Sequence, residues 1–206
     1  MDKKNRCMNE HSYNHKRTHR RGPSSYHMHN PDVVFNELNI KKGDSFLDLG
    51  CGSGDYSIQA AGLVGDSGMV YALDIWGEVL EGLNERADED GITNIKTKVC
   101  NIKENINLDD NSIDICFIST VLHTIDLSID GKRLFDEIDR VLKPRGRIVI
   151  IECKKGDYPV GPPMSCRISP EEFEEFFLPY GFEKNSYVDL GYNYIISFKQ
   201  NLNIGQ

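Results

Sequence analysis

The sequence predicts an α/β fold in which a mostly parallel sheet carries helices on both faces. Short apolar runs alternate along the chain with segments whose apolar residues repeat at helical spacing. One run, SIDICFIST at residues 112–120, is almost wholly apolar at its centre, which is typical of a buried parallel strand. Near the end, residues 182–190 and 192–200 alternate apolar and polar positions across a short turn, which indicates an antiparallel pair.

The first predicted elements follow one another closely. Pro31 stands near the start of a helical pattern over residues 29–40. The run SFLDLG at 45–50 predicts a buried strand, and residues 53–63 have helical spacing that stops at glycines. A second apolar strand, GMVYALDI, is predicted at 68–75.

The alternation continues through the middle of the chain. An amphipathic helix is predicted at 76–91 and a third strand at 94–100, before the strand at 112–120. The next helix is predicted over 131–146, stopped by the Pro-Arg-Gly at its end, and a fifth strand at 147–153. A Ser-Pro-Glu-Glu start then predicts a helix over 169–181.

Length and composition are those of a single globular domain. The chain has 206 residues, of which 39% are hydrophobic and 27% are charged. No apolar run approaches the roughly 18 residues needed to span a bilayer, and the start of the sequence lacks the apolar core of a secretory signal. We therefore expect a soluble, cytoplasmic protein with no membrane partner.

The six cysteines do not indicate a metal or redox motif. No two of them form a Cys-x-x-Cys pair, and Cys100, Cys116 and Cys153 lie in apolar runs. Free cysteine in such runs behaves as a small hydrophobic residue. The expectation is therefore buried, reduced thiols and no metal site in the main domain.

Charge divides the chain into two regions. Residues 1–29 hold seven Lys or Arg, two acids and five of the six histidines, whereas the whole chain has a net charge of −8. We therefore predict a basic, His-rich tail or lid at 1–28 and one domain at 29–206. The acidic domain argues against a nucleic-acid partner, and the sequence does not indicate an oligomeric state.

A glycine-rich turn marks the expected ligand site. Ligands of parallel α/β sheets bind beyond the carboxyl ends of the strands, where strand order reverses. Gly50 and Gly52 follow the first strand and allow a ligand to approach the backbone closely. Asp74 ends the second strand, where a carboxylate can accept both hydroxyls of a ribose. The combination indicates an adenosine-type ligand.

Two acidic residues bear on which adenosine ligand is bound. A dinucleotide turn has the pattern G-x-G-x-x-G, but Asp55 occupies the last glycine position here. Asp55 and Asp48 would both repel a pyrophosphate. Asp48 instead suits a ligand with a positive amino group or sulfonium, and S-adenosyl-L-methionine carries both. An NAD-dependent oxidoreductase is therefore the less favoured alternative.

Motifs in a fixed order resemble those of class I S-adenosylmethionine-dependent methyltransferases. They are LDLGCGSGDYS, VYALDI, CNIKENINLDDNSIDICFISTVLHTID and FDEIDRVLKPRGRIVIIE, within residues 29–199. The chain is most similar to the small-molecule branch that includes ubiquinone/menaquinone-biosynthesis and arsenite methyltransferases. The resemblance implies a Rossmann-like sheet of seven strands in the order 3-2-1-4-5-7-6, with the last strand antiparallel.

The same resemblance assigns the donor-binding positions. Asp48 would bind the methionine amino end, while Gly50 and Gly52 would pass beneath the methionine and ribose. Asp74 would hold the ribose hydroxyls, and Ile75 would lie against adenine. From the residues alone, Asp48 could instead cap the turn, and Ile75 could serve only core packing.

Three further positions complete the implied donor site. Asn101 and Ile102 would read the adenine edge, and Ser119 would offer backbone atoms to the methionine moiety. Many relatives have Asp where Asn101 stands, but an amide can still donate and accept. Asn101 could also be a plain turn residue, which its type favours.

His123 is the candidate catalytic residue. It is the only histidine outside residues 1–29 and follows the fourth strand, at the rim where the methyl group should point. An unshifted imidazole suits proton removal at neutral pH. Three roles stay open: a base, a lining of the acceptor pocket, or a structural residue.

The acceptor side is less specific. The loop KKGDYPVGPPMSCRIS at 154–169 covers the acceptor pocket in relatives, where Tyr158, Met164, Cys166 and Arg167 could line it. A trio of Cys51, Cys153 and Cys166 that holds arsenic is a further alternative. The pattern as a whole predicts transfer of a methyl group to a small-molecule acceptor. A module that binds S-adenosylmethionine without catalysis is the second hypothesis.

The histidines near the start of the chain also allow more than one interpretation. His11, His15 and His19 are four residues apart, so a helix would place them on one face, where they could bind a transition metal. A lid over the substrate and a plain basic tail are the alternatives. Tyr26, His27 and His29 could close over the cofactor, as the N-terminal segment does in relatives.

Overall fold

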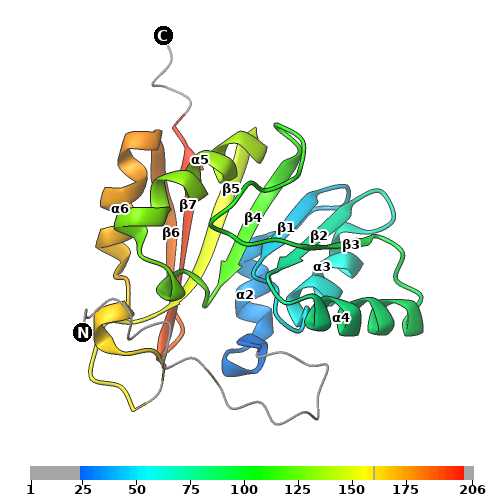
Figure 1. Ribbon diagram of the computed structural model, residues 1–206, viewed down its shortest axis with the longest axis horizontal. Coiled ribbons are helices and arrows are strands. Elements are labelled where there is room, and N and C mark those ends of the chain that lie inside the picture. Colours follow the sequence, from blue (N-terminus) through cyan, green and yellow to red (C-terminus); the bar gives the residue numbers. More distant parts are fainter. Residues whose placement is uncertain (1–23, 160, 202–206) are drawn as a thin grey trace.

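The computed structural model describes residues 24–159 and 161–201. The chain forms one seven-stranded sheet in the order β3-β2-β1-β4-β5-β7-β6 (Figure 1). The strands are β1 (Ser45–Leu49), β2 (Met69–Asp74), β3 (Ile95–Val99), β4 (Ile113–Ser119), β5 (Leu142–Cys153), β6 (Phe182–Asp189) and β7 (Asn193–Gln200). This is the predicted order.

Strand directions also agree with the prediction. The pairs β1–β2, β2–β3, β1–β4 and β4–β5 are parallel. β7 runs antiparallel between β5 and β6. The central strand β4 is buried along almost its whole length, because helices cover both of its faces.

Helices cover the two faces of the sheet unequally. The helices are α2 (Pro31–Leu38), α3 (Asp55–Val64), α4 (Gly77–Glu89), α5 (Lys132–Val141) and α6 (Pro170–Phe177). Buried side chains of α2 and α3 share one cluster with β1 and β4, and α4 packs beside them on β2. α5 and α6 contribute to the other, larger cluster and lie over the β5–β7 half of the sheet (Figure 1).

Local sequence explains where several helices begin. The Asn30 side chain accepts a hydrogen bond from the Asp32 N–H at 3.0 Å, and Pro31 occupies the first turn of α2. At α6, Ser169 and Glu172 form a reciprocal capping box. Both starts lie where the sequence predicts them.

The end of α5 differs from the prediction. The helix stops at Val141 rather than near Gly146, and both Pro144 and Gly146 lie inside β5. Leu142 already has an extended backbone and pairs with Ile113 of β4. Tertiary pairing therefore ends the helix before proline is reached.

The start of the described chain packs against the domain. Residues 26–28 form a short 3-10 helix, and the Ser25 hydroxyl lies 2.6 Å from that of Ser119 at the end of β4. The remainder of the predicted tail, including His11, His15 and His19, lies outside the described residues. None of the helices in the described ranges is long and apolar enough to cross a lipid bilayer.

Candidate functional site

The glycine turn after β1 lies at the point where strand order reverses, between β1 and β4. Gly50 and Gly52 have φ angles of 80° and 53°, in the left-handed region that favours glycine. The Gly50 N–H donates to the Leu73 carbonyl at 2.7 Å, which ties the turn to β2. A Cβ at Gly50 would lie 2.5 Å from Val121, so the turn is closely packed from the β4 side.

Asp74 is fixed by backbone donors around its carboxylate. One oxygen accepts the Gly52 N–H at 2.8 Å, and the other accepts the Trp76 N–H at 3.0 Å. A carboxylate has about four lone-pair sites, so each oxygen keeps capacity for a ligand hydroxyl. The structure therefore joins the glycine turn and the end of β2 through a single acid.

Two large apolar side chains lie exposed directly after Asp74. Ile75 is 55% exposed and Trp76 is 48% exposed. The alternative that Ile75 serves only core packing is therefore wrong. An exposed apolar pair beside an oriented carboxylate fits an adenosine, whose base needs an apolar surface and whose ribose needs an acceptor.

Asp48 is buried beneath the turn, with only 2% of its surface exposed. Burial raises its pKa to about 7, and the nearby Asp74 and Asp55 act in the same direction. The Ser57 hydroxyl donates to it at 2.6 Å and opposes that shift. A positively charged ligand group beside Asp48 would therefore favour the ionised carboxylate, because the positive charge stabilises that form.

Asp55 is paired rather than free to meet a ligand. Its carboxylate forms an ion pair with Arg86 at 2.8 Å and accepts the Ser53 hydroxyl at 2.7 Å. Burial acts to raise its pKa, but hydrogen bonds from Arg86, Ser24 and Ser53 hold that pKa below its usual value. Asp55 therefore stays ionised at the start of α3, where a pyrophosphate would otherwise bind.

Asn101 and Ile102 follow β3 on the same side of the sheet. The Asn101 side chain accepts the Lys103 N–H at 3.1 Å and donates to Glu104 at 3.3 Å. These bonds are those of a turn residue, as the alternative proposed. Ile102 is partly buried against the large core cluster, so the adenine-edge role of both residues stays a prediction.

Ser119 is buried at the end of β4, where its hydroxyl pairs with Ser25. The adjoining Tyr26 hydroxyl donates to Gln59 on α3 at 2.5 Å. The segment before α2 is thus attached to both β4 and α3, beside the glycine turn. Tyr26, one of the three N-terminal residues expected near the cofactor, thus contacts α3 through Gln59 and through the ring of Tyr56.

His123 lies buried in a short 3-10 turn after β4. Its Nδ1 atom is 2.9 Å from the Glu152 carboxylate, which is wholly buried at the end of β5. Sequence reasoning missed Glu152. A single acid that ends an apolar strand, opposite a lone histidine, is the signal that could have found it.

Arg167 organises the loop after β5. Its guanidinium is buried and donates to the carbonyls of Lys154, Gly156 and Pro162 at 2.8 to 3.0 Å. It also lies 5.6 Å from the ring centre of Tyr158. The loop expected to cover the acceptor is therefore held in shape by one buried arginine, whereas Met164 is exposed.

The thiols near the site are buried and held neutral. Burial raises the pKa of Cys51, and it raises that of Cys153 to about 11. Thiolates are the metal-binding form, and Cys166, the third member of the proposed arsenic-binding trio, is disulfide-bonded; both observations argue against that trio. Within the described ranges, no three His, Cys, Asp or Glu side chains are placed to hold a metal ion.

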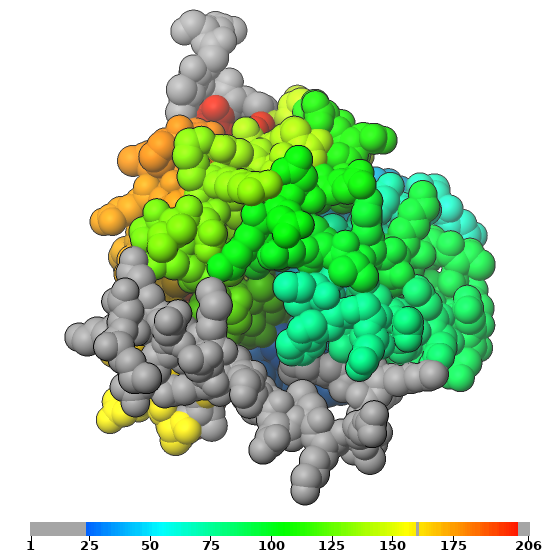
Figure 2. All heavy atoms as spheres, in the orientation of Figure 1, coloured from blue at the N-terminus to red at the C-terminus, as the bar shows by residue number. Residues whose placement is uncertain are grey.

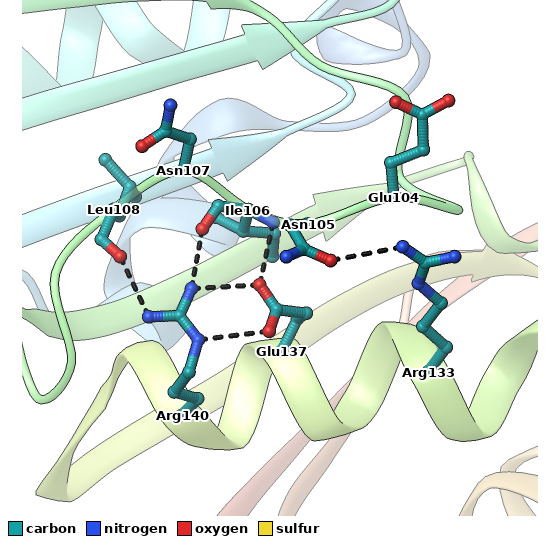
Figure 3. Close-up of a pocket in the computed structure, with 8 residues that line it drawn as sticks. All are labelled: Glu104, Asn105, Ile106, Asn107, Leu108, Arg133, Glu137 and Arg140. Atoms are coloured by element: carbon teal, nitrogen blue, oxygen red, sulfur yellow. Dashed lines mark hydrogen bonds and ion pairs between the residues drawn. The ribbon is translucent and has the colours of Figure 1, made fainter.

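A hollow lies between residues 104–108 and α5 (Figure 3). Its charged groups bind one another. Arg140 donates to the Ile106 and Leu108 carbonyls and to Glu137, which accepts the Ile106 N–H. Figure 2 shows the segment between β3 and β4, in green, on the surface between α4 and α5. Arg140 and Glu137 therefore hold that segment against α5.

Comparison with known families gives one match over most of the domain. A family model described as a methyltransferase domain matches residues 40–175. The matched region begins before β1 and ends in α6, and it contains every candidate donor residue together with His123 and Glu152.

Individual relatives are similar in sequence and in structure. The chain is 34% identical over 115 residues to a demethylmenaquinone methyltransferase of Geobacillus sp., covering 56% of this chain and 47% of that protein. It is 31% identical over 126 residues to a ubiquinone/menaquinone biosynthesis C-methyltransferase of Haemophilus ducreyi, covering 61% and 46%. The chain thus spans about half the length of these relatives.

A solved structure covers more of the chain. A SAM dependent methyltransferase from Aquifex aeolicus superposes with a TM-score of 0.77 at 28% identity. The superposition covers 88% of this chain and 95% of that protein. The superposition therefore covers more of the chain than residues 40–175, which the family model matches.

Proposed function

This chain belongs to the methyltransferase-domain family, and from that premise we propose that it transfers the methyl group of S-adenosyl-L-methionine to a small-molecule acceptor. The observation that carries the proposal is the arrangement around Asp74. An oriented carboxylate, a turn in which Gly50 and Gly52 carry no side chain and an exposed Ile75–Trp76 pair meet at one edge of the sheet.

The described residues fit this cofactor better than a dinucleotide. Gly50 and Gly52 would pass beneath the methionine and ribose, Asp74 would hold the ribose hydroxyls, and Ile75 would contact adenine. Asp48 would bind the positive amino end. When bound, S-adenosyl-L-methionine supplies a methyl carbon activated by a positively charged sulfur. Asp55, paired with Arg86, occupies the position of the last glycine in a dinucleotide turn.

The acceptor is a small molecule in this proposal. Two relatives with about one third identity are named as methyltransferases of quinone biosynthesis. The loop clamped by Arg167 follows β5. The buried pair joins His123, just after β4, to Glu152 near the end of β5. Both lie at the edge of the sheet where an acceptor would meet the methyl group. That pair favours an enzyme over a module that only binds the cofactor.

A cytoplasmic location is also part of the proposal. Cys51, Cys100, Cys116 and Cys153 are free thiols, which persist in reducing compartments, whereas Cys166 is disulfide-bonded, contrary to the expectation that all cysteines are reduced. Detection of the protein in the soluble fraction of lysed cells would support this location, whereas recovery with membranes or in the medium would contradict it.

The fluorescence of Trp76 provides the first test. It is the only tryptophan in the chain, and it lies exposed next to the proposed adenine position. Addition of S-adenosylhomocysteine should change its emission with a dissociation constant in the range of about 1 µM to 1 mM, while NAD⁺ at the same concentrations should not. Asp74→Asn should weaken the response at least tenfold, since it loses charge-assisted bonds.

Asp66→Asn provides the matched control, because Asp66 lies in the turn after α3, away from the predicted donor residues. It should leave the response unchanged. A response to NAD⁺ without one to S-adenosylhomocysteine would overturn the proposed donor.

A further inference from the structure

Glu152 is a buried acid whose oxygens accept hydrogen bonds from one turn and its own strand. One oxygen accepts the His123 backbone N–H at 3.3 Å. The other accepts the Cys153 N–H at 3.2 Å and lies 2.9 Å from His123 Nδ1. Glu152 has no exposed surface. Burying a carboxyl costs free energy unless it is hydrogen-bonded, so its ionised form depends on these donors.

The arrangement decides which ring nitrogen of His123 carries the proton. Both Glu152 oxygens already accept backbone N–H groups, and an ionised carboxylate only accepts hydrogen bonds. An ionised Glu152 therefore requires the Nδ1 atom facing it to be the donor. In a neutral imidazole the lone pair then lies on Nε2, so Nε2 is the atom that can take up a proton.

A strained turn holds His123 against Glu152. Thr120 has a φ of 55°, which is uncommon for a β-branched residue, and its N–H donates to the Ile151 carbonyl at 2.8 Å. Val121 then packs against Gly50. Strained backbone of this kind concentrates at functional sites. One turn therefore links the donor-binding glycines to the histidine.

We propose that Glu152 is a positioning residue that makes Nε2 of His123 a proton acceptor. The methyl acceptors are then small molecules that lose a proton on methylation, such as a phenol, an enol or an acidic carbon. A thioether or a trialkylarsine, which reacts through a lone pair without losing a proton, would have no use for this pair. The inference rests on the proposed methyl transfer and deepens it.

The proposed step conserves atoms and charge. The acceptor's electron pair forms the bond to the methyl carbon, while the electrons of the carbon–sulfur bond stay on the sulfur. The acceptor's proton goes to Nε2 of His123, and the resulting imidazolium faces the Glu152 carboxylate. The imidazolium later releases its proton to water. One positive charge enters with the donor and one leaves as that proton.

Nitrogen NMR tests the positioning role without a known acceptor. Protein with ¹⁵N-labelled histidine is saturated with S-adenosylhomocysteine, and the His123 signal is identified by its absence in His123→Asn. We expect the neutral ring of His123 to carry its proton on Nδ1. In Glu152→Leu that preference should weaken, since Nδ1 loses its acceptor. A proton on Nε2 in the unmodified protein would overturn the proposal.

Turnover tests the acceptor class. The probes are catechol and 2,4-pentanedione, which lose a proton, and dimethyl sulfide and trimethylarsine, which do not. We expect methylation of the first pair. Glu152→Gln should lower kcat about 10²-fold or more while the KM for S-adenosylmethionine stays within twofold. Methylation of only the second pair, or an unchanged kcat in Glu152→Gln, would overturn the proposal.

Asp114→Asn is the matched control. Asp114 lies near the opposite end of β4, where it pairs with Lys143 and accepts the Ser45 N–H. It should leave both the tautomer and kcat unchanged. Failure of S-adenosylhomocysteine to alter Trp76 emission would refute the proposed function. Binding together with an Nε2-protonated His123 would refute the positioning role alone.

Discussion

At the scale of single residues, the carboxyl of Asp48 links donor binding to pH. Burial raises its pKa to about 7, with Asp74 and Asp55 adding to the effect. The unfolded value is about 3.9, so the folded protein holds a proton that the unfolded chain releases between about pH 4 and 7. The contribution of Asp48 to stability therefore falls as pH rises through that window.

The same residue gives a binding prediction. A positive donor favours ionised Asp48, so the affinity for S-adenosylmethionine should rise by up to about tenfold per pH unit below 7 and level off above it. Calorimetry in buffers of different ionisation enthalpy should detect proton release near pH 6.5. Asp48→Asn should bind more weakly and should release no proton from this site. An unchanged pH dependence in that variant would contradict the assignment to Asp48.

Single residues were unevenly predictable from the sequence. The motif predicted that Asp48 and Asp74 lie next to the glycine turn, because Asp48 is close to it in sequence and Asp74 ends the adjacent strand. Glu152 was missed because its contact with His123 spans 29 positions and depends on the turn at Thr120. Asn101 makes the turn contact that its residue type favours, because Asn side chains readily accept the N–H two residues on, while its adenine-edge role stays a prediction.

At the scale of elements, glycine is required in the turn after β1 but not in helix α3. Gly50 has a left-handed backbone and no room for a Cβ. Gly62 lies inside α3, and a Cβ added there would have nothing within 4 Å. The turn therefore needs glycine, and the helix does not.

Unfolding in urea should separate these two positions. Gly50→Ala should lose about 1–3 kcal/mol, because its Cβ would meet Val121 and its φ would be strained. Gly62→Ala should gain about 0.5–1 kcal/mol. Gly50→Ala combined with Val121→Ala should recover part of the loss. Equal effects of the two single substitutions would show that the turn geometry is not a constraint.

The boundary between α5 and β5 shows where local patterns fail. Pro144 and Gly146 are strong signals for a helix end, and the sequence placed the end there. The helix stops earlier because Leu142 pairs with Ile113, a contact between residues 29 positions apart. Local propensity sets where a helix is possible, whereas sheet pairing decides where this one ends.

At the scale of the whole molecule, the predicted class, strand order and family are confirmed. The alternation of strands and helices predicted the parallel sheet, and resemblance to class I methyltransferases supplied the order. The basic charge predicted a tail or lid at 1–28 but could not predict its position, and the first 23 residues lie outside the described ranges.

Hydrogen exchange should map ligand binding onto this architecture. S-adenosylhomocysteine should slow exchange in residues 48–56, 72–77 and 118–123, which lie at the carboxyl ends of β1, β2 and β4. Exchange in residues 133–140 of α5, beside the hollow at residues 104–108, should be unaffected. Protection of α5 without protection of 48–56 would move the binding site to that hollow.

The position of β7 bears on how the protein is made. This strand is the last of those described along the chain, yet it inserts between β5 and β6 and places Tyr194 opposite Glu152. A chain still emerging from the ribosome can therefore complete the β1–β4 half of the sheet while one edge of β5 remains unpaired. Glu152, proposed to orient His123, gains its neighbouring strand only after β7 has been synthesised, so the glycine turn can form before the surroundings of the His123–Glu152 pair are complete.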